Sequence, residues 1–261
     1  MNTPLHDLHI HTNLSLCSSD PEQTVENIAA WAAAHGVGTI GISNHVWDCD
    51  APAGSEFYAG QPFSHIMKIR DQIPADLHGV RLLIGAETEF AGGKIMLSQA
   101  CKDQLDYLLV PHSHIHMVGL VLPKDRVTDE QVADYLVTSF CDLVSKDFAT
   151  IIAHPFGPVG RTPMQTKAIL DCISDEQFAD CFTLAAQHGA AIEINGSSFE
   201  REWNDPQLMA NHERMFSIAR DCGCTFTLGS DAHALRELCF VELAMQLAQR
   251  LSIPDDRFAH I

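Results

Sequence analysis

Short apolar runs in this chain repeatedly end in histidine or an acidic residue. Five segments share the pattern: residues 7–11, 43–45, 85–87, 153–155 and 229–233. A sixth segment, residues 110–116, carries three histidines. Imidazole and carboxylate groups together suit zinc, manganese or iron. Because the ends of strands from distant parts of a chain can meet at one point, this repetition predicts a fold that assembles a metal cluster.

Strand-like and helix-like segments alternate along the chain. The predicted strands are residues 5–11, 38–43, 81–87, 107–111, 149–153, 191–195 and 225–228. The predicted helices are residues 21–35, 63–73, 98–104, 128–147, 175–188, 206–221 and 234–250. Alternation of this kind indicates parallel βαβ units, in a barrel or an open sheet. The histidine and acidic motifs lie at nearly every predicted strand end, which favours the barrel, whose site draws on many strands.

Length and composition restrict the class of protein. The 261 residues show no linker or repeat, so we expect a single domain over 1–261. No apolar run approaches the roughly 20 residues of a membrane span, and the N-terminus lacks a signal-peptide pattern. We therefore expect a soluble, cytoplasmic protein without a membrane partner. A formal net charge of −18 disfavours binding to extended nucleic acid or anionic membrane.

The first motif places two histidines on one side of a strand. His9 and His11 alternate, so both side chains point the same way, and so does Asp7. Burying such groups without partners is costly, which favours a shared metal ion. We expect Asp7 to orient a ligand imidazole from behind.

The ordered set of motifs resembles the PHP family (polymerase and histidinol phosphatase). The likeness rests on residues 7–12, 85–87, 153–155, 193–198 and 229–233, and so covers nearly the whole chain. It implies a distorted seven-stranded (β/α)7 barrel of the PHP type. It also implies two or three divalent metal ions (Zn, Mn or Fe) that hydrolyse phosphoesters, and it is strongest toward small bacterial PHP phosphatases.

The resemblance also implies which residues bind metal. The implied ligands are His9, His11, Glu87 and Asp231 for one ion; Glu87, His154 and a histidine of residues 112–116 for a second; and His45 and His233 for a third. In the 112–116 segment the motif spacing favours His114, with His112 as the alternative. A bridging role for Glu87 is reasonable because each carboxylate oxygen can reach one ion.

The chain departs from the family pattern at the third ion. Related phosphatases have a histidine eight residues after the first histidine of the pair, where this chain has Cys17. A thiolate can bind zinc, so Cys17 is either a ligand or an ordinary loop residue beside a weak third site. Asn44 stands where the family often has aspartate. The nine cysteines, odd in number and irregularly spaced, do not suggest a disulfide framework.

Other polar residues receive weaker predictions. Residues 47–62 and 156–163 are expected to be active-site loops, and residues 252–261 a surface tail. Arg161 is a candidate phosphate clamp, because guanidinium matches phosphate oxygens in pairs, although an exposed loop arginine is an equal alternative. Glu89 is interpreted as a loop or surface residue. Asn195 is expected to orient a ligand or the substrate.

The combined prediction is a metal-dependent phosphoesterase, most simply a phosphomonoesterase that acts on a small phosphorylated substrate. Bound ions would acidify water to supply a hydroxide and would neutralise phosphate charge. The alternatives are a phosphodiesterase or exonuclease acting on nucleotides or short oligonucleotides, and a histidinol phosphate phosphatase. A barrel that has lost metal and serves a regulatory role is a further alternative. The sequence selects neither the substrate nor the oligomeric state.

Overall fold

Seven parallel strands form the centre of the protein in a computed structural model that describes residues 5–50, 53–116, 128–146, 151–157 and 160–261. Their order around the sheet is β1 (Leu5–Ile10), β2 (Val37–Ile42), β4 (Arg81–Thr88), β7 (Tyr107–Pro111), β8 (Ile151–Ala153), β9 (Ala191–Asn195) and β10 (Phe226–Gly229). The two-residue β3 (His45–Val46) extends the sheet beside β4, with His45 opposite Glu87.

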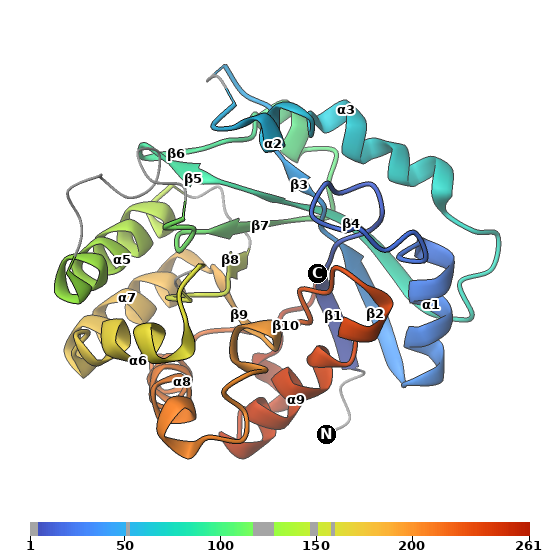
Figure 1. Cartoon of the computed structure of the whole chain (residues 1–261). Coiled ribbons are helices and arrows are strands. Elements are labelled where there is room, and N and C mark those ends of the chain that lie inside the picture. The colour runs from blue at the N-terminus through green and yellow to red at the C-terminus, as the bar shows by residue number, and fades with distance from the viewer. Residues whose placement is uncertain (1–4, 51–52, 117–127, 147–150, 158–159) are drawn as a thin grey trace.

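Backbone hydrogen bonds bring the first and last strands together. The Asp231 N–H donates to the His9 carbonyl at 2.7 Å, and the His11 N–H donates to the Ala232 carbonyl at 3.0 Å. The sheet therefore curves into a nearly closed barrel, seen end-on in Figure 1. This confirms the predicted seven-stranded α/β barrel.

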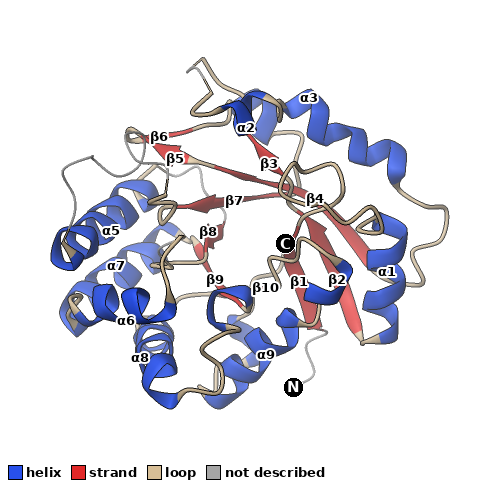
Figure 2. Ribbon diagram, viewed as in Figure 1, coloured by secondary structure: helices blue, strands red, loops and turns tan. Residues whose placement is uncertain are grey.

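Helices surround the strands on the outside of the barrel (Figure 2). They are α1 (Val25–Ala34), α2 (Glu56–Ala59), α3 (Phe63–Ile66), α4 (Gln99–Lys102), α5 (Asp129–Val144), α6 (Pro163–Asp171), α7 (Asp175–His188), α8 (Pro206–Asp221) and α9 (Phe240–Arg250). Among the described residues, no helix combines the length and the apolar character that crossing a membrane would require.

Polar N-terminal caps fix where three of these helices begin. Thr128, Thr162 and Ser174 each accept a hydrogen bond from the backbone N–H of a glutamine three residues later, and that glutamine bonds back to the cap. This reciprocal capping box satisfies donors that a helix start leaves free. The helix after Thr162, α6, was not among the predicted elements, although Thr162, Pro163 and Gln165 form its start signal.

Tyr107 fills the barrel between several strands. Its side chain lies over Gly41 of β2 and Gly85 of β4, where an added Cβ would lie 2.3 Å from the hydroxyl oxygen and 2.4 Å from the ring, respectively. Its hydroxyl donates to the Leu8 carbonyl of β1 at 2.8 Å. Glycine is needed at both positions because the ring occupies the space of any side chain.

Several predicted boundaries differ from the structure. The predicted helix 21–35 begins at Val25, because Thr24 provides the cap while Asp20 accepts a hydrogen bond from the Leu235 N–H instead. The predicted surface tail is wrong in part, since Phe258 is buried and forms a bridge with Phe226 of β10. Residues 149–150 of a predicted strand and residue 147 of a predicted helix lie outside the described part of the chain.

Candidate metal centre

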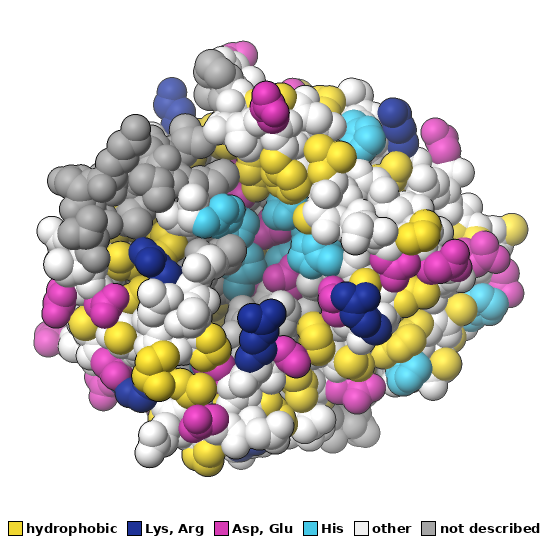
Figure 3. Space-filling model, viewed as in Figure 1, with side chains coloured by type: hydrophobic (Ala, Val, Ile, Leu, Met, Phe, Trp, Pro, Cys, Tyr) yellow, Lys and Arg dark blue, Asp and Glu magenta, His cyan; other side chains and the backbone are white. Residues whose placement is uncertain are grey.

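Histidine and acidic side chains gather at the carboxyl ends of the strands. They are His9 and His11 at the end of β1, His45 in β3, Glu87 in β4, and His114, His154, Asp231 and His233 in the loops that follow β7, β8 and β10. In the space-filling view, histidines surround a hollow at the centre of this face, with acidic groups among them (Figure 3). Segments far apart in sequence therefore meet at one mouth, as the barrel prediction requires.

The first group of ligand atoms comes from β1 and the loop after β10. The Nε2 atoms of His9 and His11 lie 3.2 Å apart, and Oδ1 of Asp231 lies 3.5 and 3.4 Å from them. One oxygen of Glu87, Oε2, lies 3.3 Å from the His9 nitrogen. Four donors thus face one another across a space of the kind that an ion fills.

The second group uses the other oxygen of Glu87. Its Oε1 lies 3.0 Å from Nε2 of His154 and 3.8 Å from Nε2 of His114. Glu87 is buried, which by itself would raise its pKa, but His45 and His9 beside it hold that pKa well below its usual value. A carboxylate with one oxygen toward each of two imidazole groups has the geometry of a bridge between two ions.

The third group contains a thiol. His11, Cys17, His45 and His233 each offer one atom within 4.8 Å of the others. The His11 ring stacks on the rings of His45 and His233, with centroids 4.7 and 4.3 Å apart. Although burial alone would raise it, the pKa of Cys17 falls to about 3 beside His11, which favours a thiolate.

Glu193 orients His9 from behind. Its Oε1 lies 2.7 Å from Nδ1 of His9, so that nitrogen carries the proton and Nε2 faces the cluster. Asp7 was expected to do this, but its Oδ1 instead accepts the backbone N–H groups of His9 and Ser230 at 3.2 and 2.9 Å. Burial raises the pKa of Asp7 to about 7. The residue therefore fixes the backbone where β1 meets β10.

Glu89 lies beside the second group, whereas the sequence analysis placed it in a loop or at the surface. It is fully buried, and its Oε1 lies 2.6 Å from Nδ1 of His114. The Tyr58 hydroxyl donates to the same oxygen. Burial would raise the pKa of Glu89, but His114 lowers it, so the carboxylate stays ionised. Glu89 follows β4 directly, and its spacing of two residues from Glu87 was the signal that both face inward.

His112 and His114 take different places. His114 lies in the second group, whereas the Nε2 atom of buried His112 accepts the Phe156 backbone N–H at 3.0 Å. The His112 ring packs edge-on against Phe140 and Phe156. Burial, with a smaller contribution from His154, lowers the pKa of His112 to about 3. The structure thus places His112 outside all three groups, in the core beside α5.

Two residues of the cluster have unusual backbone angles. His154 and Asp231 have positive φ values of 27° and 55°, a region that side chains other than glycine rarely adopt. Such strain persists where surrounding contacts fix it, and it concentrates at functional sites. The backbone of Asp231 is held by the hydrogen bond from its N–H to the His9 carbonyl, and its side-chain Oδ2 lies 3.4 Å from Nδ2 of Asn195.

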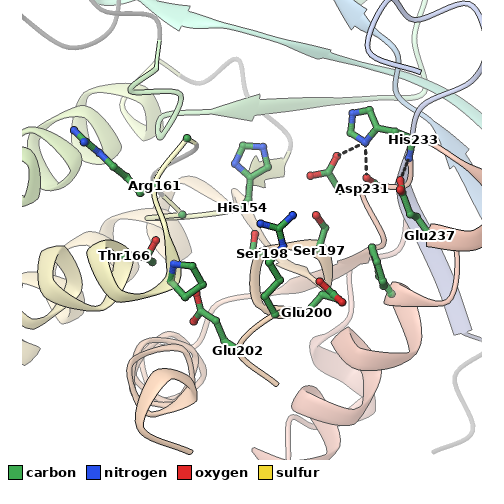
Figure 4. Close-up of a pocket in the computed structure, with 15 residues that line it drawn as sticks. His154, Arg161, Thr166, Ser197, Ser198, Glu200, Glu202, Asp231, His233 and Glu237 are labelled. Carbon is green, nitrogen blue, oxygen red and sulfur yellow. Dashed lines mark hydrogen bonds and ion pairs between the residues drawn. The ribbon is translucent and has the colours of Figure 1, made fainter. Parts of the chain in front are cut away.

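A cavity of about 600 Å³ opens beside the cluster. His154, Asp231 and His233 form one wall, and Ser197 and Ser198 lie near them (Figure 4). Its arginines are Arg161 and Arg201. Figure 4 shows the Arg161 side chain extending away from His154, so in this conformation it does not point at the cluster.

Comparisons with known proteins agree with this architecture. A probable phosphatase of Shewanella oneidensis is 26% identical over 253 residues, which cover 96% of this chain and 85% of its own length. The probable phosphatase YcdX of Escherichia fergusonii is 26% identical over 260 residues, covering 98% and 89%. No protein-family model matches the chain.

A solved structure shares the fold. It is the crystal structure of histidinol phosphate phosphatase from Lactococcus lactis, complexed with zinc, L-histidinol and phosphate. It aligns with a TM-score of 0.64 at 18% identity, over 96% of this chain and 95% of that one. Over nearly its whole length the chain is therefore similar to probable phosphatases, and it shares its fold with a histidinol phosphate phosphatase.

Proposed function

We propose that this protein is a metal-dependent phosphomonoesterase that acts on a small molecule. The observation that carries the proposal is the position of Glu87, whose two oxygens face the separate imidazole groups of His9 and His154. Of these two histidines, His154 also lines the cavity. His9, His11 and Asp231 would hold one ion, and His114 and His154 a second, with Glu87 shared. Zinc, manganese and iron all fit imidazole and carboxylate donors.

The donor set fits divalent cations. His9 and His11 direct nitrogens at each other, and Nδ1 of His11 forms no hydrogen bond within the described part of the chain. Buried polar atoms without partners are costly, and coordination would satisfy them. Bound ions would supply Lewis acidity, which activates water and neutralises phosphate charge.

The protein's own residues would shape the phosphate site. Asp231 and His233 line both the cluster and the cavity, so a phosphate in the cavity reaches the cluster directly. Ser197 and Ser198 present hydroxyl groups at the same wall. Arg201, or Arg161 after a change of rotamer, would pair with phosphate oxygens.

The cavity favours a small substrate over a polymer. A volume of about 600 Å³ is in the range of small-molecule sites. The net charge of −18 disfavours binding to a nucleic-acid strand. The relative solved with L-histidinol and phosphate makes histidinol phosphate one member of the substrate panel.

The proposal is tested by assaying the purified chain with an aryl phosphate in manganese or zinc. The variants His9→Ala and Asp231→Asn should reduce kcat at least about 100-fold, because each removes a donor of the first group. Asparagine tolerates the left-handed backbone of Asp231, so that variant should still fold. His188→Asn, an exposed histidine at the end of α7, is the matched control.

A parallel assay with a bis-aryl phosphate separates the two phosphoesterase classes. Faster turnover of the monoester supports the proposal, while a preference for the diester or for oligonucleotides would replace it with a phosphodiesterase. Undiminished activity in both His9→Ala and Asp231→Asn would show that the metal cluster does not take part in the reaction. Comparing Arg161→Met with Arg201→Met identifies the phosphate contact, since only its loss should raise KM strongly.

A further inference from the structure

The third ligand group differs chemically from the other two. Glu87 and Asp231 serve the first two groups, whereas the third consists of His11, His45, His233 and the Cys17 thiol, with no carboxylate. We propose that the Sγ atom of Cys17 is a ligand to a zinc ion held with His45 and His233, and that this site discriminates against manganese. His11 lies at the boundary between this group and the first.

The histidine rings around Cys17 have nitrogen atoms that could coordinate a metal ion. The Nδ1 atom of His233 lies 2.8 Å from the Asp231 carbonyl and can only donate there, which leaves Nε2 as an acceptor (Figure 4). His11 and His45 are buried; Nδ1 of His11 has no hydrogen-bond partner among the described residues, and Nδ1 of His45 faces only Oε2 of Glu87, at 3.2 Å. These nitrogens are an observation independent of the cysteine, and they indicate a cation as their partner.

The loop that carries Cys17 is held in place from several sides. The buried Gln61 side chain accepts hydrogen bonds from the Leu16 N–H at 3.0 Å and the Ser15 hydroxyl at 3.1 Å. The Ser18 hydroxyl donates to the His233 carbonyl at 2.7 Å, which ties the loop to the ligand on the opposite side. A loop fixed at Leu16 and Ser18 positions the residue between them, as a preformed ligand requires.

Asn44 supports the same loop instead of acting as a ligand. Its Oδ1 accepts the Thr12 backbone N–H at 2.8 Å, and its Nδ2 donates to the Thr12 hydroxyl at 3.0 Å. The side chain of Asn44 is therefore occupied by hydrogen bonds to Thr12, where the loop that carries Cys17 begins. The third group depends on imidazole and thiol donors.

Donor chemistry decides which ion this set would prefer. Thiolate and imidazole together are typical zinc ligands in tetrahedral sites, whereas manganese prefers carboxylate and other oxygen ligands. The first two groups, rich in carboxylate, would accept either ion. Zinc should therefore remain at the third group when manganese occupies the others. The inference rests on the proposed metal centre but does not require phosphatase activity.

The test loads the metal-stripped protein with Co²⁺ and records its absorption spectrum. Thiolate ligation should give a sulfur-to-cobalt charge-transfer band in the near ultraviolet. Cys17→Ser and Cys17→His should abolish this band, and Cys17→His should still bind cobalt, which shows that the variant is folded. Cys101→Ser, which changes a half-buried cysteine in α4, should keep the band.

A second measurement addresses metal preference. After dialysis against excess Mn²⁺, elemental analysis should find zinc retained in the parent protein and reduced at least about 10-fold in Cys17→Ser. A parent protein without the band, or a band that survives in Cys17→Ser, would overturn the proposal. A clear band in a protein without phosphatase activity would support this inference while contradicting the proposed function.

Discussion

Nδ1 of His114 lies 2.6 Å from Oε1 of Glu89, and both side chains are buried. The carboxylate accepts the Nδ1 proton, so Nε2 of His114 is free to face Glu87 and an ion. Tyr58, in α2, donates to the same carboxylate oxygen. This chain of contacts connects α2 to the second ligand group.

Replacing Glu89 should therefore weaken metal binding without removing a ligand. Glu89→Gln can present its NH2 group to His114 and favour the wrong tautomer, so metal affinity should fall about 10–100-fold. Competition titration with a chromogenic chelator measures this effect. Tyr58→Phe should have a smaller effect, and Glu56→Gln, an exposed acid in α2, should have none. Unchanged affinity in Glu89→Gln would reduce Glu89 to a structural residue.

The two histidines after β7 should separate by phenotype. His114→Gln removes a donor of the second group, and we expect lower metal content with stability nearly unchanged. His112→Phe leaves the buried Phe156 N–H without an acceptor, and should lower the free energy of unfolding by about 1–3 kcal/mol while metal content stays the same. Elemental analysis and chemical denaturation measure the two effects. The reverse pattern would make His112 the ligand.

Gly229 leaves room for the pair that orients His9. A Cβ at this position would lie 2.1 Å from Oε1 of Glu193 and 2.7 Å from the His9 Cβ. Gly229→Ala should displace one of the pair, and should reduce both activity and stability, the latter by about 1–3 kcal/mol. Thermal unfolding and a metal titration follow the two losses. Normal metal affinity in Gly229→Ala would show that the barrel can accommodate the added methyl group without displacing His9.

His6 should make stability depend on pH. Burial, and to a smaller extent His260, lowers its pKa from 6.5 to about 4, and its Nε2 accepts the Leu228 N–H at 3.0 Å. Between pH 6.5 and 4, His6 is protonated in the unfolded chain but stays neutral in the folded protein. Stability is thus fully present above pH 6.5 and falls as the pH drops to 4, by about 3 kcal/mol for this group.

The variant His6→Gln isolates this contribution. It keeps an acceptor for the Leu228 N–H but has no titrating group, so its free energy of unfolding should change less between pH 6.5 and 4. Denaturant unfolding across that interval measures the slope. His260→Asn, at an exposed position, should retain most of the dependence. Parallel curves for parent and His6→Gln would contradict the assignment.

Local sequence rules predicted much of the fold. The apolar strands alternate with amphipathic helices, and α7 and α8 begin and end where the periodicity predicts. The start of α1 was missed because Gln23 is buried, with its side-chain amide donating to the Ala232 carbonyl 209 residues away. Such a contact overrides the local preference for starting the helix at Pro21.

The sequence by itself determined that imidazoles and carboxylates stand at the ends of strands, because the periodicity of apolar residues marks those ends. Only the tertiary structure decided what each side chain faces. It turned His114 toward Glu87 and His112 into the core, and it buried Glu89 beneath Tyr58. The direction of a side chain beyond a strand depends on backbone angles and on neighbours distant in sequence, such as His233, which contacts Ser18 from 215 positions further along the chain. Local sequence patterns cannot predict those neighbours, because the contacts form only when distant parts of the chain fold together.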